Sequence, residues 1–250
     1  YHDMYAAGRS DTLHPRLNDA QNLWDHWGPQ KGDEIRIDYG TISTGNMFIS
    51  SVVPENGSFS ITAQAAPLWG FDPQNKSWQQ VRLLQIAQEI AQRNGLTLQT
   101  YGVEDHLYPY NFQNNEGDLP HLNRLAVREG NAILVYDKTL ILYNERYMEA
   151  QEPREALNIA ADGEYRFNDR SFALYGACTV ENGSYSGTFS VDNGSTRIYR
   201  PENVGSVGSN DEAKRFAKNL LRSVNKGCYG GFVRTRILAR YSAGSTVILS

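Results

Sequence analysis

The chain has 250 residues, of which 40% are hydrophobic, so it is long enough to bury a core in one large domain or about two to three small ones. With a net charge of -4, it lacks the excess of lysine and arginine that tight binding to a phosphate backbone requires. No run approaches the roughly 20 apolar residues of a membrane-spanning helix, so we expect no membrane insertion.

The N-terminal part, residues 1–70, is predicted to form an arm and a first β-barrel. Residues 1–22 are mixed and polar without a period, which is typical of a loop or arm. Strands are predicted where apolar and polar residues alternate, at Glu34–Tyr39, Met47–Val53 and Ser58–Ala65. Pro54-Glu55-Asn56-Gly57 supplies the turn between the last two.

Two tryptophans, Trp24 and Trp27, stand just before these strands. They are compatible with a sugar-binding platform or with a buried plug. We favour burial, because large aromatic side chains beside a strand entry usually join the core.

An α+β module is predicted over residues 71–145. Ser77 and Gln80 have the spacing of a capping box, and the apolar residues that follow recur at helical intervals until Asn94-Gly95. Strands are then expected from Leu96 and over Tyr108–Gln113. The module is predicted to close with a hairpin of Ala132–Val135 and Leu140–Tyr143.

The most informative segment of this module lies between the predicted strand Tyr108–Gln113 and the predicted hairpin that starts at Ala132. Asp118 is positioned to accept hydrogen bonds from the first amides of a new helix, with Pro120 tolerated in the first turn. Leu119, Leu122, Leu125 and Ala126 share one face of that helix. Gly130 is predicted to end it in the left-handed conformation that favours glycine.

The C-terminal part, residues 146–250, is predicted to be a second β-barrel with one helix. Strands are expected at Tyr165–Phe167, Phe172–Cys178 and Tyr185–Val191. Ser209 has capping spacing ahead of Glu212, and an apolar stripe follows at helical intervals. Two further strands are predicted, at 231–237 and 246–249. The pattern of strand, turn and strand in Ile37–Ile49 recurs in Ile237–Ile248, which is a weak sign of two related barrels.

No familiar catalytic or metal motif is present. The histidines and cysteines lack metal-ligand spacing, so we expect no metal and no cofactor, and we expect Cys178 and Cys228 to be buried or reduced. The acidic pairs Glu104-Asp105 and Glu116/Asp118 have the composition of a glycosidase acid and base. A loop position for the first pair and helix capping for the second explain them better.

The segment from Gln113 to Gly130 resembles the phage late control D protein family. Members of that family carry a Gln-x-x-Glu-Ser-Asp-like turn, a Phe-Leu-x-Arg-Leu-Ala-like helix and a glycine. The matching residues, which we interpret as a structural motif, are Gln113, Glu116, Asp118, Leu122, Arg124, Leu125, Ala126 and Gly130. Gly117 stands where the family usually has serine, and His121 stands where it usually has an aromatic residue.

This resemblance implies an α+β fold with two small, mostly antiparallel β-barrel domains and an inserted α+β module. It implies a hub of a contractile phage tail or a related injection particle, similar to the base of type VI secretion spikes. Such a hub is a homotrimeric ring that joins the tail tube protein to the central spike protein. DNA would pass through its lumen without specific binding, and the particle would assemble in the cytoplasm of the bacterial host.

Two other functions remain open. Hubs of this family can carry lytic domains, so a tail-associated cell-wall hydrolase is the first alternative. A carbohydrate- or receptor-binding module that uses Trp24, Trp27 and exposed tyrosines is the second. We predict a non-enzymatic structural protein.

Overall fold

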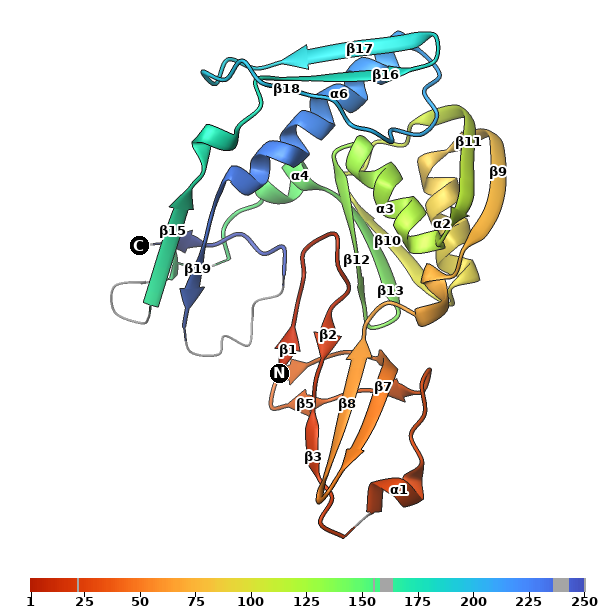
Figure 1. Ribbon diagram of the computed structural model, residues 1–250, viewed down its shortest axis with the longest axis vertical. Helices are drawn as coiled ribbons and strands as arrows, with labels where there is room; N and C mark the ends of the chain where they lie inside the picture. Colours follow the sequence, from red (N-terminus) through yellow and green to blue (C-terminus); the bar gives the residue numbers. More distant parts are fainter. Residues whose placement is uncertain (22, 155, 158–163, 236–242, 250) are drawn as a thin grey trace.

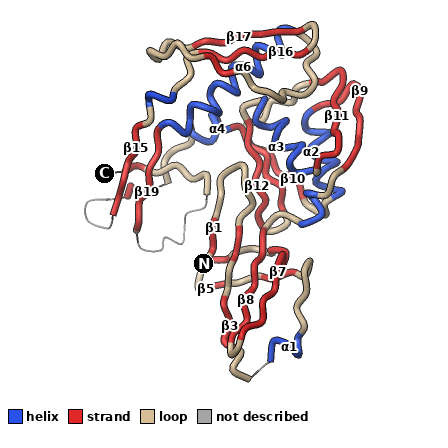
Figure 2. The backbone as a smooth tube through the Cα atoms, in the orientation of Figure 1, coloured by secondary structure: helices blue, strands red, loops and turns tan. Residues whose placement is uncertain are grey.

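The computed structural model describes residues 1–21, 23–154, 156–157, 164–235 and 243–249. The molecule is elongated, with a sheet of N-terminal strands and the short helix α1 at one end and the longer helices gathered toward the other (Figures 1 and 2). Helices and mostly antiparallel sheets are combined, which confirms the predicted α+β class. Among the described residues, parallel pairing is confined to β10 with β13, β14 with β20 and β16 with β18.

The N-terminal end is an open sheet with the strand order β1-β2-β8-β7-β4, and β3 also pairs with β8. Its elements are β1 (His2–Asp3), β2 (Thr12–Leu13), β3 (Arg16–Asn18), α1 (Leu23–Trp27), β4 (Glu34–Ile35), β5 (Asp38–Tyr39), β6 (Ile42–Ser43), β7 (Met47–Glu55) and β8 (Ser58–Gln64). The two long strands β7 and β8 confirm the predicted hairpin around Pro54–Gly57.

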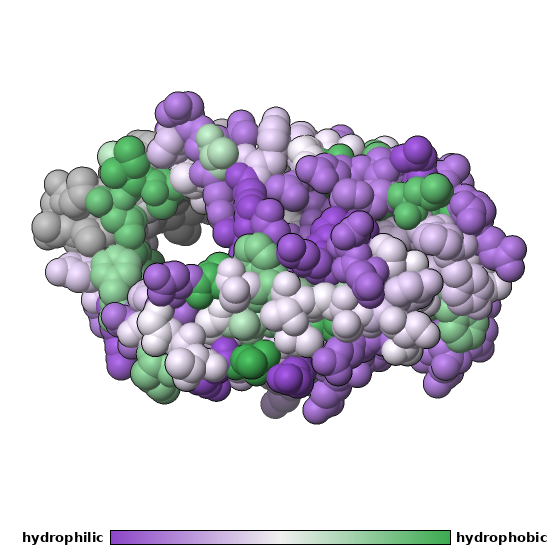
Figure 3. Space-filling view, turned by 90° about the horizontal axis from the view of Figure 1, so that it is seen from above, coloured by the Kyte–Doolittle hydropathy of each residue, from purple (hydrophilic) through white to green (hydrophobic). Residues whose placement is uncertain are grey.

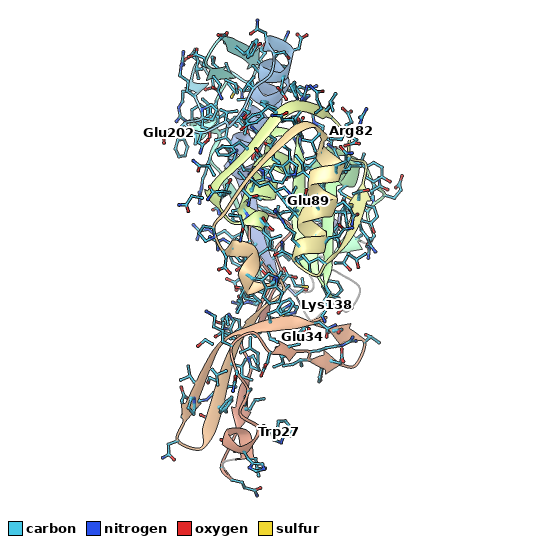
Figure 4. The ribbon with its side chains drawn as sticks, turned by 90° about the vertical axis from the view of Figure 1, so that its right-hand side faces the viewer. Trp27, Glu34, Arg82, Glu89, Lys138 and Glu202 are labelled. Atoms are coloured by element: carbon cyan, nitrogen blue, oxygen red, sulfur yellow. The ribbon has the colours of Figure 1, made fainter. Side chains whose placement is uncertain are left out.

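Two predictions for this end are wrong. Residues 1–22 are not only loop, because β2 and β3 pair with β8 and Leu13 is buried in the core. Strands of two or three residues are too short to show a period. Trp27 is not a buried plug: it ends a five-residue helix, and 73% of the residue is exposed. Figure 4 shows it at the far end of the sheet. The side chain of Trp24 lies outside the described residues.

The central module contains the three-stranded sheet β10-β13-β12 and the two-stranded β9–β11 ribbon, with α2 and α3 packed among them (Figure 1). Its elements are η1 (Leu68–Phe71), β9 (Gln74–Arg82), α2 (Leu83–Arg93), β10 (Thr97–Tyr101), β11 (Leu107–Glu116), α3 (Asp118–Arg128), β12 (Asn131–Tyr136), β13 (Thr139–Asn144) and α4 (Glu145–Glu149). The predicted hairpin before α4 is confirmed by the antiparallel pairing of β12 with β13.

The predicted capping box at Ser77 is wrong. Residues 74–82 form strand β9, in which Trp78 pairs with Asn111 and Val81 pairs with Tyr108. Helix α2 therefore begins only at Leu83, and the backbone N–H of Arg82 donates to the Gln85 side chain instead (2.8 Å). Pairing with a strand about 30 residues away outweighs a local signal of about 1 kcal/mol.

The C-terminal part contributes one long helix and several small sheets. Its elements are β14 (Ala156–Leu157), β15 (Glu164–Asp169), η2 (Ser171–Ala173), β16 (Ala177–Asn182), β17 (Tyr185–Ser190), β18 (Ile198–Tyr199), α6 (Asn210–Asn225), η3 (Lys226–Cys228), β19 (Tyr229–Arg234) and β20 (Ile248–Leu249). The predicted cap of α6 is confirmed, because the Ser209 hydroxyl accepts from the backbone N–H of Glu212 (3.1 Å).

The strand predicted at Phe172–Cys178 is wrong in its first half. Residues 171–173 form a 3-10 turn in which Phe172 is largely exposed, and strand β16 starts at Ala177. The repeat predicted in Ile237–Ile248 falls largely on residues 236–242, which lie outside the described residues.

The main core joins the central module to α6. Helix α3 packs against α2, α6 and β12, while α2 also packs against β10 and α6 packs against β16 and β17. Fully buried side chains include Leu83, Ile86, Ile90, Leu122, Leu125, Leu140, Leu142 and Phe216. Each contributes about 1.5–3 kcal/mol of hydrophobic free energy. A smaller cluster around Ile49, Phe59 and Ile61 supports the N-terminal sheet.

The N-terminal sheet is joined to the module at the tip of the β12–β13 hairpin. Asp137 and Lys138 form its two-residue turn with positive φ values of 45° and 58°, as a type I′ hairpin turn requires. One Asp137 oxygen accepts from the backbone and the side chain of Asn46 (2.9 and 2.8 Å). Lys138 pairs with Glu34 at 2.6 Å, where Figure 4 shows the sheet meeting the hairpin.

Both cysteines are free thiols on buried side chains, and burial raises the pKa of the Cys178 thiol to about 11. None of the described helices has the length and apolar character needed to cross a bilayer.

Candidate functional site

The start of helix α3 is held by a buried carboxylate, but not as the sequence predicts. The N-cap is Gly117, which offers no side chain, and the Asp118 carboxylate points inward instead. It accepts from Arg93 Nη2 (2.6 Å), Asn94 Nδ2 (2.9 Å) and Gln113 Nε2 (2.9 Å). Asp118 therefore ties α3 to the end of α2 and to β11, and it does not cap its own helix.

Gly117 departs from the serine of the family pattern for a steric reason. A Cβ at this position would lie 2.7 Å from the backbone of Phe71 in η1. Real Cβ atoms do not approach backbone so closely, so only glycine lets η1 pack against the turn between β11 and α3.

A second network of polar side chains surrounds His121, which is fully buried. Arg124 makes a bidentate pair with Glu116, with Nη2 to Oε2 at 2.7 Å and Nε to Oε1 at 3.2 Å. His121 Nδ1 lies 3.1 Å from Glu116 Oε2, and Nε2 lies 2.9 Å from Asn111 Nδ2. Its ring stacks on Trp78 with a centroid distance of 5.5 Å.

The imidazole of His121 is neutral at pH 7. Burial lowers its pKa to about 4, although the hydrogen bond to Glu116 acts in the opposite direction. With the proton on Nδ1, the ring donates to Glu116 and its Nε2 accepts from Asn111; Nη2 of Arg124 also lies 3.1 Å from Nδ1. Burial would raise the pKa of Glu116, but its bonds to Arg124 and His121 outweigh this and lower it.

The remaining predicted motif residues pack and turn the chain. Leu122, Leu125 and Ala126 are fully buried on the core face of α3. Gly130 has a φ of 72°, and a Cβ there would lie 2.9 Å from the Asn219 side chain of α6. All eight residues thus belong to one strand-helix unit, and their role as a family motif stays a prediction.

A buried polar network at the end of α3 was missed from the sequence. Arg215 of α6 makes two bonds to Glu129 (2.8 and 3.0 Å), and the Tyr108 hydroxyl donates to the same carboxylate (2.7 Å). Burial, with the Glu129 charge beside it, raises the pKa of Tyr108. The residues come from β11, α3 and α6, so no local pattern reveals them.

Three of the four acidic residues considered as catalytic pairs are engaged in internal bonds, whereas Glu104 is largely exposed beside His106. Asp105 accepts from the backbone N–H of Leu84 in α2 (2.9 Å), while Glu116 and Asp118 are paired with arginines. The histidines, cysteines and carboxylates of the described residues form no group suited to holding a metal ion.

The two-stranded β15–β19 ribbon carries a group of exposed aromatic side chains. Directly opposed residues share a face, so Tyr165, Phe167, Val233 and Tyr229 lie together. The three aromatic residues among them are 53–58% exposed. Figure 3 shows apolar residues gathered on this side of the molecule.

The opposite face of the ribbon is more polar. Glu164, Arg166, Asn168 and Arg234 lie there together with Phe232, and Glu164 pairs with Arg234 at 3.4 Å. The alternation of Tyr165 and Phe167 with Arg166 and Asn168 is the only sequence signal for this amphipathic ribbon. Its partner strand, about 65 residues further on, is not predictable from that signal.

Comparison with solved structures identifies the class of fold as that of phage tail proteins. The whole chain aligns with 83% of the 43 kDa tail protein of prophage MuSo2 from Shewanella oneidensis, with a TM-score of 0.74 and 11% identity. It also aligns over its whole length with 80% of a tail protein from Neisseria meningitidis, with a TM-score of 0.73 and 12% identity.

A component of the E. coli type VI secretion system, protein c3393, shares the fold more distantly. It covers 67% of this chain and 51% of its own length, with a TM-score of 0.50 and 10% identity, and it is itself structurally similar to the T4 tail proteins gp27 and gp5. No protein-family model matches the sequence, and no curated protein is detectably similar to it. The predicted likeness to phage tail proteins and to the base of type VI secretion spikes is thus confirmed at the level of fold.

Proposed function

We propose that this protein is a non-enzymatic structural hub of a contractile phage tail or a phage-derived injection particle. Three copies form a ring that joins the tail tube protein to the central spike protein. The observation that carries the proposal is the fold shared with two phage tail proteins along the entire chain. The particle assembles in the cytoplasm of the bacterial host.

The β15–β19 ribbon supplies a physical reason for assembly. A two-stranded ribbon is marginally stable by itself, and neither strand pairs with a third one within the described residues. Its apolar face and its open edges are features that proteins normally cover. In the proposed ring, a neighbouring copy covers this face.

We propose the division into residues 1–70, 71–145 and 146–250 as the working parts of the hub. The Gln113–Gly130 unit acts as the structural centre of the middle part, because its polar side chains bond to one another. Net charge -4 suits a lumen through which DNA slides, since phosphate is repelled and not trapped.

A cell-wall hydrolase is less well supported. Glu116 and Asp118 bond to Arg124 and Arg93, so neither carboxylate is available to act on a substrate in the way that a glycosidase requires. Turnover of purified peptidoglycan that is lost on replacing Glu116 and Asp118 would favour the hydrolase over the hub.

The test is the mass of the purified protein by light scattering or native mass spectrometry. We expect three times the 28.1 kDa of the chain, and a threefold ring by negative-stain microscopy. Replacing Tyr165 and Phe167 with alanine removes two half-exposed rings, worth roughly 1 kcal/mol each, and should weaken association at least about tenfold.

The chain provides a matched control for this variant. Tyr110 and Phe112 form the same Tyr-x-Phe pattern on the β9–β11 ribbon, so their replacement with alanine should leave the trimer intact. A strictly monomeric protein at all concentrations, both alone and with tube and spike proteins, would refute the ring.

A further inference from the structure

A groove of about 740 Å³ lies between strand β11 and the segment 203–208 that leads into α6. Tyr110, Phe112 and Asn114 of β11 form one wall, and Asn203 with the following residues forms the other. Glu116 and Arg124 also line it. Its volume is in the range of small-ligand sites, and we call it the β11 groove.

Two aromatic rings form a platform along one wall of the β11 groove. Asn111 and Gln113 point into the core, so Tyr110 and Phe112 point outward on the same face. Their rings are nearly parallel, with an interplanar angle of 19° and a centroid distance of 6.4 Å, and both residues are more than 40% exposed. The corresponding rings of Tyr165 and Phe167 are tilted by 42°.

The polar lining of the groove is rich in amides and has no net charge. Asn114, Asn182 and Asn203 each carry both donors and an acceptor. The only charged groups in the lining are Glu116 and Arg124, which neutralise each other through two hydrogen bonds. A phosphate or a nucleic acid would find no cation available, so the lining favours a neutral ligand with many hydroxyl groups.

The second wall is held in place by hydrogen bonds from the buried Arg128 and the exposed Asn182. The guanidinium of Arg128, stacked on Phe216 at 4.8 Å, donates to the carbonyl oxygens of Val204 and Ser206. The Asn182 side chain donates to the carbonyl oxygen of Gly205.

The backbone conformation of Gly205 favours glycine. Its φ is 74°, and a Cβ would lie 2.5 Å from the Arg124 guanidinium. Because this wall is already ordered, less conformational entropy is lost when a ligand binds.

We propose that the β11 groove binds a neutral oligosaccharide. The C–H face of a sugar ring packs on an aromatic face, while its hydroxyl groups are donors and acceptors that match the asparagine amides. An extended peptide would instead require apolar side-chain pockets, and half of this lining is polar. This binding function is separate from the proposed assembly, because it uses β11 and not the β15–β19 ribbon.

The test titrates chitotriose, maltotriose and cellotriose separately into the full chain, followed by intrinsic fluorescence and saturation-transfer NMR. We expect at least one to bind with a Kd of about 1 mM or tighter. Replacing both Tyr110 and Phe112 with alanine should weaken that binding at least about tenfold, because stacking on the platform is lost. The variant of Tyr165 and Phe167 should bind the sugar normally.

Three results would overturn the proposal: no binding of any of the three sugars, equal binding by the platform variant, or equally strong binding of a sulfated heparin tetrasaccharide. Far-ultraviolet circular dichroism confirms that the platform variant is folded. Its mass should also equal that of the unmodified protein. The two Tyr-x-Phe variants therefore separate the proposals, since one should lose sugar binding and the other should lose the trimer.

Discussion

The His121→Phe variant should be less stable than the unmodified protein at pH 7 and more stable than it at low pH. The pKa of His121 is about 4 in the folded protein and about 6.5 in an unfolded chain. Because the folded-state pKa is lowered, the full stability is present above pH 6.5 and is lost as the pH falls toward 4. The loss is about 1.4 kcal/mol per pH unit, or about 2 kcal/mol by pH 5 and about 3 kcal/mol by pH 4.

Phenylalanine keeps the stack on Trp78 but cannot accept the hydrogen bond from Asn111 Nδ2. An unsatisfied buried amide costs about 1–3 kcal/mol, so the variant should be less stable than the unmodified protein at pH 7. It has no imidazole to titrate. The difference in stability should therefore shrink by about 2 kcal/mol between pH 7 and pH 5 and change sign near or below pH 5.

Urea unfolding measured at half-unit pH steps gives the difference directly. Ile133→Val is the matched control, because it costs about 0.5–1.5 kcal/mol in the same core without removing a titrating group. Its difference from the unmodified protein should be the same at every pH. If the His121→Phe difference is also constant, the imidazole does not titrate in the way that its burial implies.

Three other substitutions test single contacts by urea unfolding. Asp118→Asn should lower the free energy of unfolding by about 2–4 kcal/mol, because three donors converge on the carboxylate. The control Asp211→Asn, in the exposed first turn of α6, should lower it by less than about 1 kcal/mol. Equal losses for the two variants would contradict this role of Asp118. Ser209→Ala should cost about 1 kcal/mol through loss of the α6 cap, and Ser209→Asp should restore it. Gly130→Ala should cost more than about 1 kcal/mol because of its positive φ, and Gly227→Ala, with open space and no positive φ, should be nearly neutral.

Local signals in the sequence predicted those elements whose ends are set by nearby residues. Ser209 caps α6, Gly130 ends the α3 segment, and the apolar stripe of α3 is buried as expected. The β12–β13 hairpin was predicted from the alternation of apolar and polar residues on both sides of a short loop. Each of these features involves residues fewer than about 20 positions apart.

Features that depend on distant partners were not predictable. Trp78 lies in a strand because it pairs with Asn111, and no local pattern of residues 74–82 contains that information. Asp118 has the sequence context of a cap, yet its carboxylate bonds to Arg93 and Asn94 of the preceding helix. The short strands β2 and β3 pair with β8, about 40–50 residues further along the chain.

In the candidate sites, too, the local signals were readable from the sequence and the contacts between distant residues were not. The alternating Tyr165 and Phe167 indicate an amphipathic strand, but only the fold reveals that their face is exposed. The β11 groove combines residues of β11 with Arg124, Asn182 and the 203–208 segment, and the buried Arg128 reaches Val204 across 76 positions. Contacts of this range depend on the packing of α3 against α6, which no motif encodes.

The turn at Asp137 and Lys138 constrains how this chain can change in length. Its two residues close a hairpin and at the same time hold Asn46 and Glu34 of the N-terminal sheet. An insertion there would displace the anchoring carboxylate and ammonium together, so this tip should tolerate insertions or deletions far less than an ordinary surface turn. Tags and fusion partners are better placed at the exposed turn around Gly40, where a Cβ would meet no neighbour.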